Sequence, residues 1–295
     1  KVSKLSGSSK NVNINLDKLT LSKNILDINK IEISKDNLVL DDKKANFSLL
    51  TKKTDIALNS LKIDNGKTSL NSITLKTPGL DFNDNNAKMS VKTPDLNINI
   101  NSLLVNGSKT SISSIALKTP SIEYDDAKSK MNVKTSTVDL DVNALAINGA
   151  KTSIKSINLK TPNIDFDDEK AKMNVKTSNI NLDLDSFSIN DSKILLKEIT
   201  LLKPSVKFVD NTNNLKIDAN NMELYVSNIS KINDILVIDS VKLIEPDLDF
   251  LDTSSNTKIE AKKIDLQIKK LSNSNAGFKI EKTDLNNPNI AITLP

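Results

Sequence analysis

The sequence contains no cysteine, histidine, tryptophan or arginine. Without cysteine there is no disulfide framework. Without cysteine and histidine there are no metal sites built from thiolate or imidazole, and no His-based catalytic triad. Arginine is the side chain best suited to bidentate recognition of bases and phosphates. Since the basic residues are all lysine and the net charge is only +4, the composition argues against nucleic acid as a partner.

Aromatic residues make up 3% of the chain and hydrophobic residues 37%, which is too little for a thick compact core. We therefore expect a thin, extended one. No apolar run approaches the ~18 residues of a membrane-spanning helix. The chain begins at Lys1 and shows no signal peptide, so we expect it to be a segment of a longer protein whose targeting and anchoring segments lie elsewhere.

Proline recurs at a spacing of 42 residues, at positions 78, 120, 162, 204, 246 and 288. Asp36 occupies the equivalent place one step earlier. Seven copies of 42 residues account for almost the whole chain. The sequence therefore predicts a single continuous repeat array over residues 1–295.

Within each repeat, apolar and polar residues alternate with period 2, which is typical of β-strands with one buried face. Turn signals occur twice in each repeat and are of two alternating kinds: Asn106-Gly107 in one place, the Asp-rich run 167–171 in the other. The pattern predicts an elongated all-β antiparallel meander of seven two-strand repeats. The alternative is a parallel β-solenoid.

The alternation slips by one residue twice in each strand, which is the signature of a β-bulge. With the turn at 167–172 centred near 169.5, Pro162 is predicted to lie opposite Thr177, so that slips on neighbouring strands are aligned. Proline is suited to such places because it cannot donate to the sheet. Aligned slips predict two bend lines, which fold the sheet into a trough (a β-taco or groove) with its apolar face inside.

The residues expected to line the inside of the trough are apolar positions that recur from repeat to repeat. They are Leu80, Phe82, Ile98, Ile122, Tyr124, Leu140, Ile154, Ile157, Leu159, Ile164, Phe166, Met173, Val175, Ile180, Leu182, Leu184, Phe187, Ile189, Val206 and Phe208. A face of this size exceeds the apolar patch that a soluble monomer exposes. The trough must therefore be closed on itself or filled by something apolar.

The text of residues 151–166, Lys-Thr-Ser-Ile-Lys-Ser-Ile-Asn-Leu-Lys-Thr-Pro-Asn-Ile-Asp-Phe, resembles the AsmA-like group of bacterial envelope proteins, in particular its DUF748 type. The resemblance implies a long β-groove in the periplasm of a Gram-negative bacterium, anchored in the inner membrane by another part of the same chain. It also implies that the groove shields the acyl chains of phospholipids or other lipids in transit to the outer membrane.

Two other functions stay open: a structural scaffold with a dry core, and an adhesin-like repeat at the cell surface. No catalytic residue, cofactor or metal is predicted. The Asp-rich turns, such as Asp125-Asp126, lack the glycine and distal glutamate of a calcium loop. The strands at both ends of the chain would leave backbone groups unpaired, so we expect end-to-end self-association of the isolated segment unless flanking sequence covers those edges.

Overall fold

The computed structural model describes residues 5–9, 11–275, 277–286 and 289–294. It divides into two compact units, Lys1–Gly149 and Ala150–Pro295, each described here by itself. The described residues contain strands and turns but no helix. Whether the repeats form one continuous array stays a prediction.

The N-terminal unit contains fourteen strand segments: β1 (Leu5–Ser9), β2 (Val12–Ser22), β3 (Ile25–Lys35), β4 (Leu38–Asp42), β5 (Phe47–Thr51), β6 (Thr54–Asp64), β7 (Lys67–Thr77), β8 (Leu80–Asp84), β9 (Met89–Thr93), β10 (Leu96–Asn106), β11 (Lys109–Thr119), β12 (Ile122–Asp126), β13 (Met131–Thr135) and β14 (Val138–Asn148). The C-terminal unit contains twelve: β15 (Lys151–Asp168), β16 (Met173–Asn190), β17 (Lys193–Leu202), β18 (Ser205–Asp210), β19 (Leu215–Asn220), β20 (Glu223–Ile232), β21 (Ile235–Ile244), β22 (Asp247–Asp252), β23 (Thr257–Lys262), β24 (Asp265–Ser274), β25 (Gly277–Asn286) and β26 (Asn289–Thr293).

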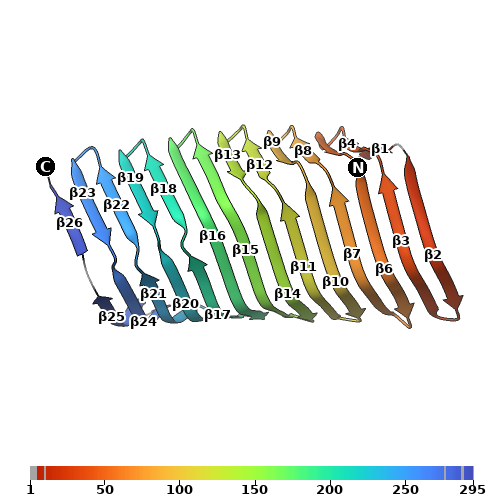
Figure 1. The fold of residues 1–295 in the computed structure, drawn as a ribbon. Helices are drawn as coiled ribbons and strands as arrows, with labels where there is room; N and C mark the ends of the chain where they lie inside the picture. Colours follow the sequence, from red (N-terminus) through yellow and green to blue (C-terminus); the bar gives the residue numbers. More distant parts are fainter. Residues whose placement is uncertain (1–4, 10, 276, 287–288, 295) are drawn as a thin grey trace. The chain divides into compact units, whose positions relative to one another are not determined.

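Most segments are the two parts of one long strand, separated by a break of two residues, as β7 and β8 are (Figure 1). Counted in this way, each unit has seven long strands. Sequential long strands pair antiparallel, for example β10 with β11 and β20 with β21. Among the described residues no pairing closes either unit into a barrel. The predicted antiparallel meander is confirmed, and the parallel solenoid is wrong, because the alternating hairpin turns reverse the chain twice in each repeat.

The first predicted bend line is present as the row of strand breaks. In the N-terminal unit three of the breaks fall at Pro78-Gly79, Pro94-Asp95 and Pro120-Ser121, where proline withholds an N–H from the sheet, whereas others, such as Lys52-Lys53, contain no proline. In the C-terminal unit two of the breaks comprise Lys203-Pro204 and Glu245-Pro246, in which Lys203 and Glu245 adopt left-handed φ values of 47° and 46°. Two others have a left-handed residue without a proline, Asn221 and Lys263. The same bend is thus associated with two different backbone features: a proline, which cannot donate a hydrogen bond, and a residue with a left-handed φ.

The predicted register at this line is wrong by two residues. Thr177 pairs with Ile164, and Pro162 lies level with Asn179 where the ladder skips one residue on each strand. The reason is the turn. Asp168 pairs with Met173, so the turn comprises residues 169–172 and its centre is shifted by one residue from the assumed position.

A second bend line is marked by left-handed residues at the same position in each repeat. They are Lys18, Ser60, Ser102, Ala144, Ser186, Asn228 and Lys270, with φ between 46° and 55°. At each one the ladder skips a residue on both strands: Asn101 pairs with Ser114, and the next pair is Leu103 with Ile112. Because both strands slip together, the apolar side chains stay on one face across the bend.

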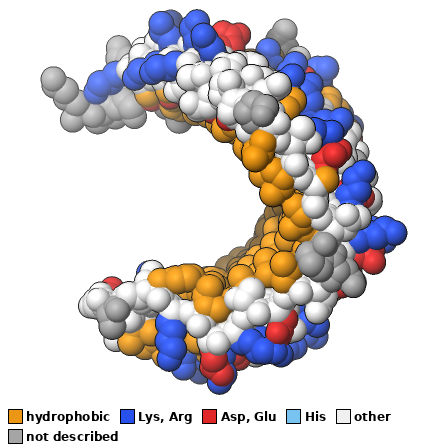
Figure 2. Space-filling model, turned by 90° about the vertical axis from the view of Figure 1, so that its left-hand side faces the viewer, with side chains coloured by type: hydrophobic (Ala, Val, Ile, Leu, Met, Phe, Trp, Pro, Cys, Tyr) orange, Lys and Arg blue, Asp and Glu red, His pale blue; other side chains and the backbone are white. Residues whose placement is uncertain are grey.

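Apolar and polar cross-strand rows alternate along the strands. In the C-terminal unit, Leu159 pairs with Leu182, whereas the next residues along, Asn158 and Asp183, pair with each other. Figure 2 views this unit from its C-terminal end. Its strands curve into an arc, with hydrophobic side chains on the concave side and lysine, aspartate and glutamate outside. The face assignment predicted from the period of 2 therefore agrees with the structure.

The turns between the short segments are capped by an aspartate that recurs once in each repeat. Asp126 Oδ1 accepts hydrogen bonds from the N–H groups of Lys128 and Ser129, both at 2.9 Å. Asp252 Oδ1 likewise accepts from Ser254 N at 2.8 Å, and its carboxylate also accepts from both serine hydroxyls. These aspartates are thus occupied in holding the turn together.

The turn at Asp252 leads to a pH prediction. The hydroxyl groups of Ser254 and Ser255 lower the pKa of Asp252 to about 2. A lowered folded-state pKa means that the carboxylate stabilises the fold above its ordinary pKa, near 4, and that this contribution is lost as the pH falls towards 2. In urea unfolding, the stability difference between the wild type and Asp252→Asn should be largest above pH 4 and shrink towards pH 2. A difference that is constant across this range would contradict the role of the charge.

Candidate functional site

The concave face of the C-terminal unit carries an unbroken row of leucines that runs across all seven long strands. Each leucine is the direct cross-strand partner of the next. The row is Leu159, Leu182, Leu201, Leu224, Leu243, Leu266 and Leu285. Directly paired residues lie on the same face of a sheet with their Cβ atoms about 5 Å apart. The row is therefore a continuous aliphatic track perpendicular to the strands.

Further apolar rows flank the leucine row. One is Ile157, Leu184, Ile199, Val226, Val241 and Ile268, ending at Thr283. A second flanking row lies beyond the second bend and consists of Ile154, Phe187, Leu196, Ile229, Ile238, Leu271 and Ile280. A third flanking row lies beyond the first bend and consists of Phe166, Val175, Phe208, Ile217, Phe250, Ile259 and Ile292. The rows together make one broad apolar surface.

The N-terminal unit has the same arrangement with isoleucine in place of most leucines. Its central row is Ile14, Ile33, Ile56, Leu75, Ile98, Leu117 and Leu140. The neighbouring row is Leu16, Ile31, Leu58, Ile73, Ile100, Ile115 and Val142. Neither row is interrupted by a polar side chain.

These rows are not covered by other parts of the same unit. Among the described residues only four hydrophobic side chains besides proline are buried, namely Ile28, Leu70, Ala219 and Ala261. Away from the edge strands, the leucines and isoleucines of the central rows are half-buried, shielded by their neighbours in the sheet and open on the concave side. A closed, dry core would bury most of them. The structure therefore presents an open apolar face on each unit.

Pairing places most of the predicted lining residues in these rows. Ile98 and Leu140 belong to the central row of the N-terminal unit, and Phe82 and Tyr124 lie in a row beyond its first bend, where both pair with Val91. Leu80 and Ile122 lie beside the strand breaks, where they pair with Thr93 and Thr135. In the C-terminal unit, Ile164 and Val206 are both partners of Thr177. Ile154, Ile157, Leu159, Phe166, Val175, Leu182, Leu184, Phe187 and Phe208 belong to the rows given above.

Three predicted lining residues lie outside the uninterrupted apolar rows. Met173 pairs with Asp168 and Asp210, so its row is interrupted by the aspartates that cap the turns. Ile189 pairs with Ile194, but the next residue of that row is Lys231. Ile180 pairs with Thr161 at the break line. Met173 and Ile189 therefore border the face, whereas Ile180 lies within it, at the first bend.

Buried threonines at the first bend line of each unit were not predicted. Thr77, Thr93, Thr119 and Thr161 are all buried, and each precedes a proline. Their hydroxyl groups donate to the carbonyl oxygens two residues ahead: Thr77 to Gly79 at 3.1 Å, Thr93 to Asp95 at 2.9 Å and Thr119 to Ser121 at 3.0 Å. The hydroxyl replaces a hydrogen bond that the break removes from the ladder. The recurrent Thr-Pro pair was the signal for it in the sequence.

No protein-family model matches this chain. A search of curated proteins also finds no match. The function is therefore argued first from the geometry.

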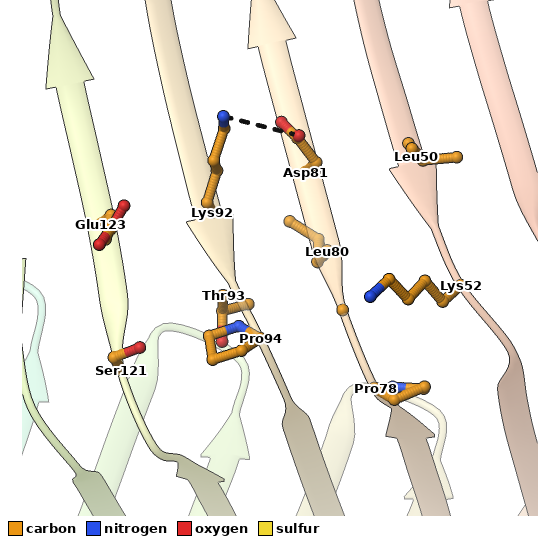
Figure 3. A pocket seen from close by; sticks show the side chains of 11 residues that line it. Leu50, Lys52, Pro78, Leu80, Asp81, Lys92, Thr93, Pro94, Ser121 and Glu123 are labelled. Carbon is orange, nitrogen blue, oxygen red and sulfur yellow. Dashed lines mark ion pairs between the residues drawn. The ribbon is translucent and has the colours of Figure 1, made fainter.

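An open pocket of about 390 Å³ lies at the first bend line of the N-terminal unit, lined in part by Pro78 and Pro94 (Figure 3). Three of its charged residues come from one polar cross-strand row, in which Asp81 pairs with Lys92 and Lys92 with Glu123. The fourth, Lys52, lies at a neighbouring strand break. The Lys92 ammonium lies 3.8 Å from the Asp81 carboxylate, and both side chains are well exposed. The pocket is thus an open hollow beside the strand breaks, with one ion pair at its surface.

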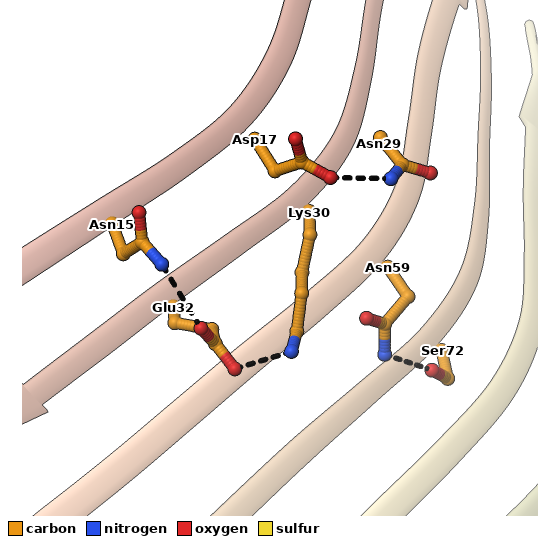
Figure 4. A network of polar contacts seen from close by, with 7 residues as sticks. All are labelled: Asn15, Asp17, Asn29, Lys30, Glu32, Asn59 and Ser72. Carbon is orange, nitrogen blue, oxygen red and sulfur yellow. Dashed lines mark hydrogen bonds and ion pairs between the residues drawn. The ribbon is translucent and has the colours of Figure 1, made fainter.

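The convex face carries polar side chains that are largely paired with one another. In the N-terminal unit, Asn15 Nδ2 donates to Glu32 Oε2 at 3.3 Å, and Lys30 forms an ion pair with the same carboxylate (Figure 4). The hydrogen bonds from Lys30 and Asn15 lower the pKa of Glu32. Nearby, Asn59 Nδ2 donates to Ser72 Oγ at 2.7 Å. Such contacts are typical of a solvated outer surface.

Within the described residues, no group of three or more acidic side chains is arranged to hold a metal ion. Those residues also include no helix with the length and hydropathy needed to cross a bilayer. The apolar concave face is accordingly the feature from which a function is argued.

Proposed function

We propose that the concave apolar face of each unit binds the acyl chains of lipids and shields them from water while they move between membranes. The observation that carries this proposal is the unbroken aliphatic row, which crosses seven long strands in each unit and stays half-exposed. An acyl chain lying along such a row contacts methyl groups over its whole length. Each methylene group that leaves water contributes about 0.8 kcal/mol.

The two faces of the sheet suit this role in different ways. The concave face offers no hydrogen-bonding side chain along its central rows, so an acyl chain meets no fixed partner and can slide. The convex face carries its charges in pairs such as Lys207 with Asp218, 3.3 Å apart, and Lys176 with Asp165, 2.9 Å apart. This face is suited to contact with water.

The resemblance of residues 151–166 to AsmA-like proteins supports a location in the bacterial envelope. On this proposal the chain belongs to the periplasm of a Gram-negative bacterium, between an inner-membrane anchor carried by flanking segments and the outer membrane. The lipid is a phospholipid or another lipid with long acyl chains. The protein acts as a carrier surface rather than as an enzyme.

The test is to purify residues 1–295, extract bound lipid for mass spectrometry, and titrate the delipidated protein with a pyrene-labelled fatty acid. We expect co-purified acyl lipids and saturable binding of the probe, with several probe molecules per chain. Probe binding should fall in Leu182→Asp and persist in Ser188→Asp, which changes the opposite face of the same strand. Protein that is free of lipid and binds no probe while its strand content is retained would refute the carrier and favour the scaffold.

A further inference from the structure

Lys35 places a positive charge on the concave face of the N-terminal unit. It lies two residues from Ile33 of the central row, so both side chains project from the same face of β3. The residue between them, Ser34, belongs to the opposite face, where its hydroxyl donates to Asp55 Oδ1 at 2.6 Å. In the sheet, Lys35 pairs with Thr54 at the first bend line. A cationic side chain thus lies beside the central aliphatic row.

A chain of buried threonine hydroxyls holds this ammonium in place. Lys35 Nζ donates to Thr51 Oγ1 at 3.1 Å, and Thr51 Oγ1 lies 3.0 Å from Thr54 Oγ1. Thr54 donates to Thr77 Oγ1 at 3.3 Å, and Thr77 donates to the carbonyl oxygen of Gly79 at 3.1 Å. The three threonines are 7%, 5% and 2% exposed. Because their hydroxyl hydrogens are directed towards Gly79, Thr51 is left as an acceptor for the ammonium.

The repeat does not require a lysine at this position. In the next three repeats a buried threonine takes its place: Thr77, Thr119 and Thr161. A later repeat has Lys203 there, but that side chain is 71% exposed and its ammonium lies 3.9 Å from the Glu223 carboxylate. Lys35 differs from the threonines in its charge and from Lys203 in its surroundings.

The ammonium of Lys35 has no counter-ion within the part of the chain that the structure describes. Its hydrogen bond to Thr51 uses one of three N–H donors, and the other two have no acceptor there. Burial lowers the pKa of Lys35, and no carboxylate lies close enough to oppose that effect. A partly desolvated cation without a counter-ion is unfavourable, so an anion bound beside it would be stabilised.

We propose that Lys35 binds the anionic headgroup of an acyl lipid, a phosphate or a carboxylate, whose acyl chain lies along the central row of the N-terminal unit. This inference rests on the proposed function, since the acyl chain must lie on the concave face. The ammonium donates to the headgroup oxygens in charge-assisted hydrogen bonds. From there the acyl chain passes over Ile33 and its cross-strand partner Ile56. Lys35 thereby fixes the headgroup at one point of a surface that otherwise holds only the acyl chain.

The test compares a pyrene-labelled fatty acid in its ionised form with its methyl ester, which has the same acyl chain and no charge. At the tightest site of the wild type, the acid should bind roughly tenfold more tightly than the ester, as expected for a hydrogen bond between charged groups. Lys35→Met, which keeps the aliphatic length without the charge, should abolish this preference, and Lys35→Arg should retain it. The matched control is Lys203→Met, at the same repeat position, which should bind both probes as the wild type does.

The possible outcomes separate this inference from the carrier function. Equal affinity of the wild type for acid and ester would overturn the role of Lys35 while leaving the carrier in place. So would a preference that survives in Lys35→Met, or one that Lys203→Met abolishes as well, in variants whose urea unfolding shows that they are folded. If neither probe binds, both proposals fail. Displacement of the bound acid by lysophosphatidic acid or by an unlabelled fatty acid of the same chain length then decides between phosphate and carboxylate, because the preferred headgroup displaces it at the lower concentration.

Discussion

Replacing Leu182 by aspartate is expected to destabilise the C-terminal unit by about 3 kcal/mol and to interrupt binding along its apolar face. Leu182 lies between Leu159 and Leu201 in the central row. The leucine side chain loses its contacts with both neighbours, and the carboxylate is placed on a surface that has no cationic side chain in that row. The free energy of unfolding, measured by urea denaturation, and the titration with the pyrene-labelled fatty acid report the two effects separately.

The matched control is Ser188→Asp, on the same strand β16 but on the opposite face. Ser188 pairs with Ser153 and Leu195 on the polar side, where water reaches the new carboxylate. We expect its free energy of unfolding to change by no more than about 0.5 kcal/mol, with unchanged binding of the probe. Equal destabilisation by the two substitutions would mean that the concave face is no drier than the convex one, contrary to the face assignment.

Thr119→Val is expected to cost about 2 kcal/mol of stability, although it preserves the shape of the side chain. The Thr119 hydroxyl donates to the carbonyl oxygen of Ser121 at 3.0 Å and lies 2.5 Å from the hydroxyl oxygen of Thr93. With Thr119 only 2% exposed, water cannot fully replace either contact. The loss is measured as the free energy of unfolding in urea, followed by the fluorescence of a single fluorophore attached to the N-terminal unit.

Thr110→Val provides the comparison on the same strand β11. Thr110 has the aliphatic partners Val105 and Ile147 on either side, so an added methyl group in place of its hydroxyl meets similar surroundings. We expect a change near zero or a slight gain in stability. If both valine variants behave alike, the threonine row at the bend does not support the break in the ladder.

Sequence reasoning was most successful where it depended on the residues of one strand alone. Alternation such as Ile180-x-Leu182-x-Leu184 assigns each side chain to a face whichever strand lies beside it, because successive side chains of a strand point in opposite directions. It failed on the register at Pro162 because register depends on which residues close the turn. Asp168 caps a turn of four residues, and the composition of the Asp-rich run does not show where pairing stops.

The sequence by itself determined that this protein is a β repeat with one apolar and one polar face, because a period of 2 and a spacing of 42 leave few alternatives. Its alternating turn signals favoured the antiparallel meander, and the strand pairing decided it against the parallel solenoid. Only the tertiary structure decided that Leu159, Leu182 and Leu201 follow one another in a single row, that the Thr-Pro pairs place their hydroxyls in a buried line, and that the apolar face of each unit stays open. Those features depend on the register between neighbouring strands and on the angle through which each bend turns the sheet. Both are set by pairing between residues far apart in the chain, which a local pattern does not encode.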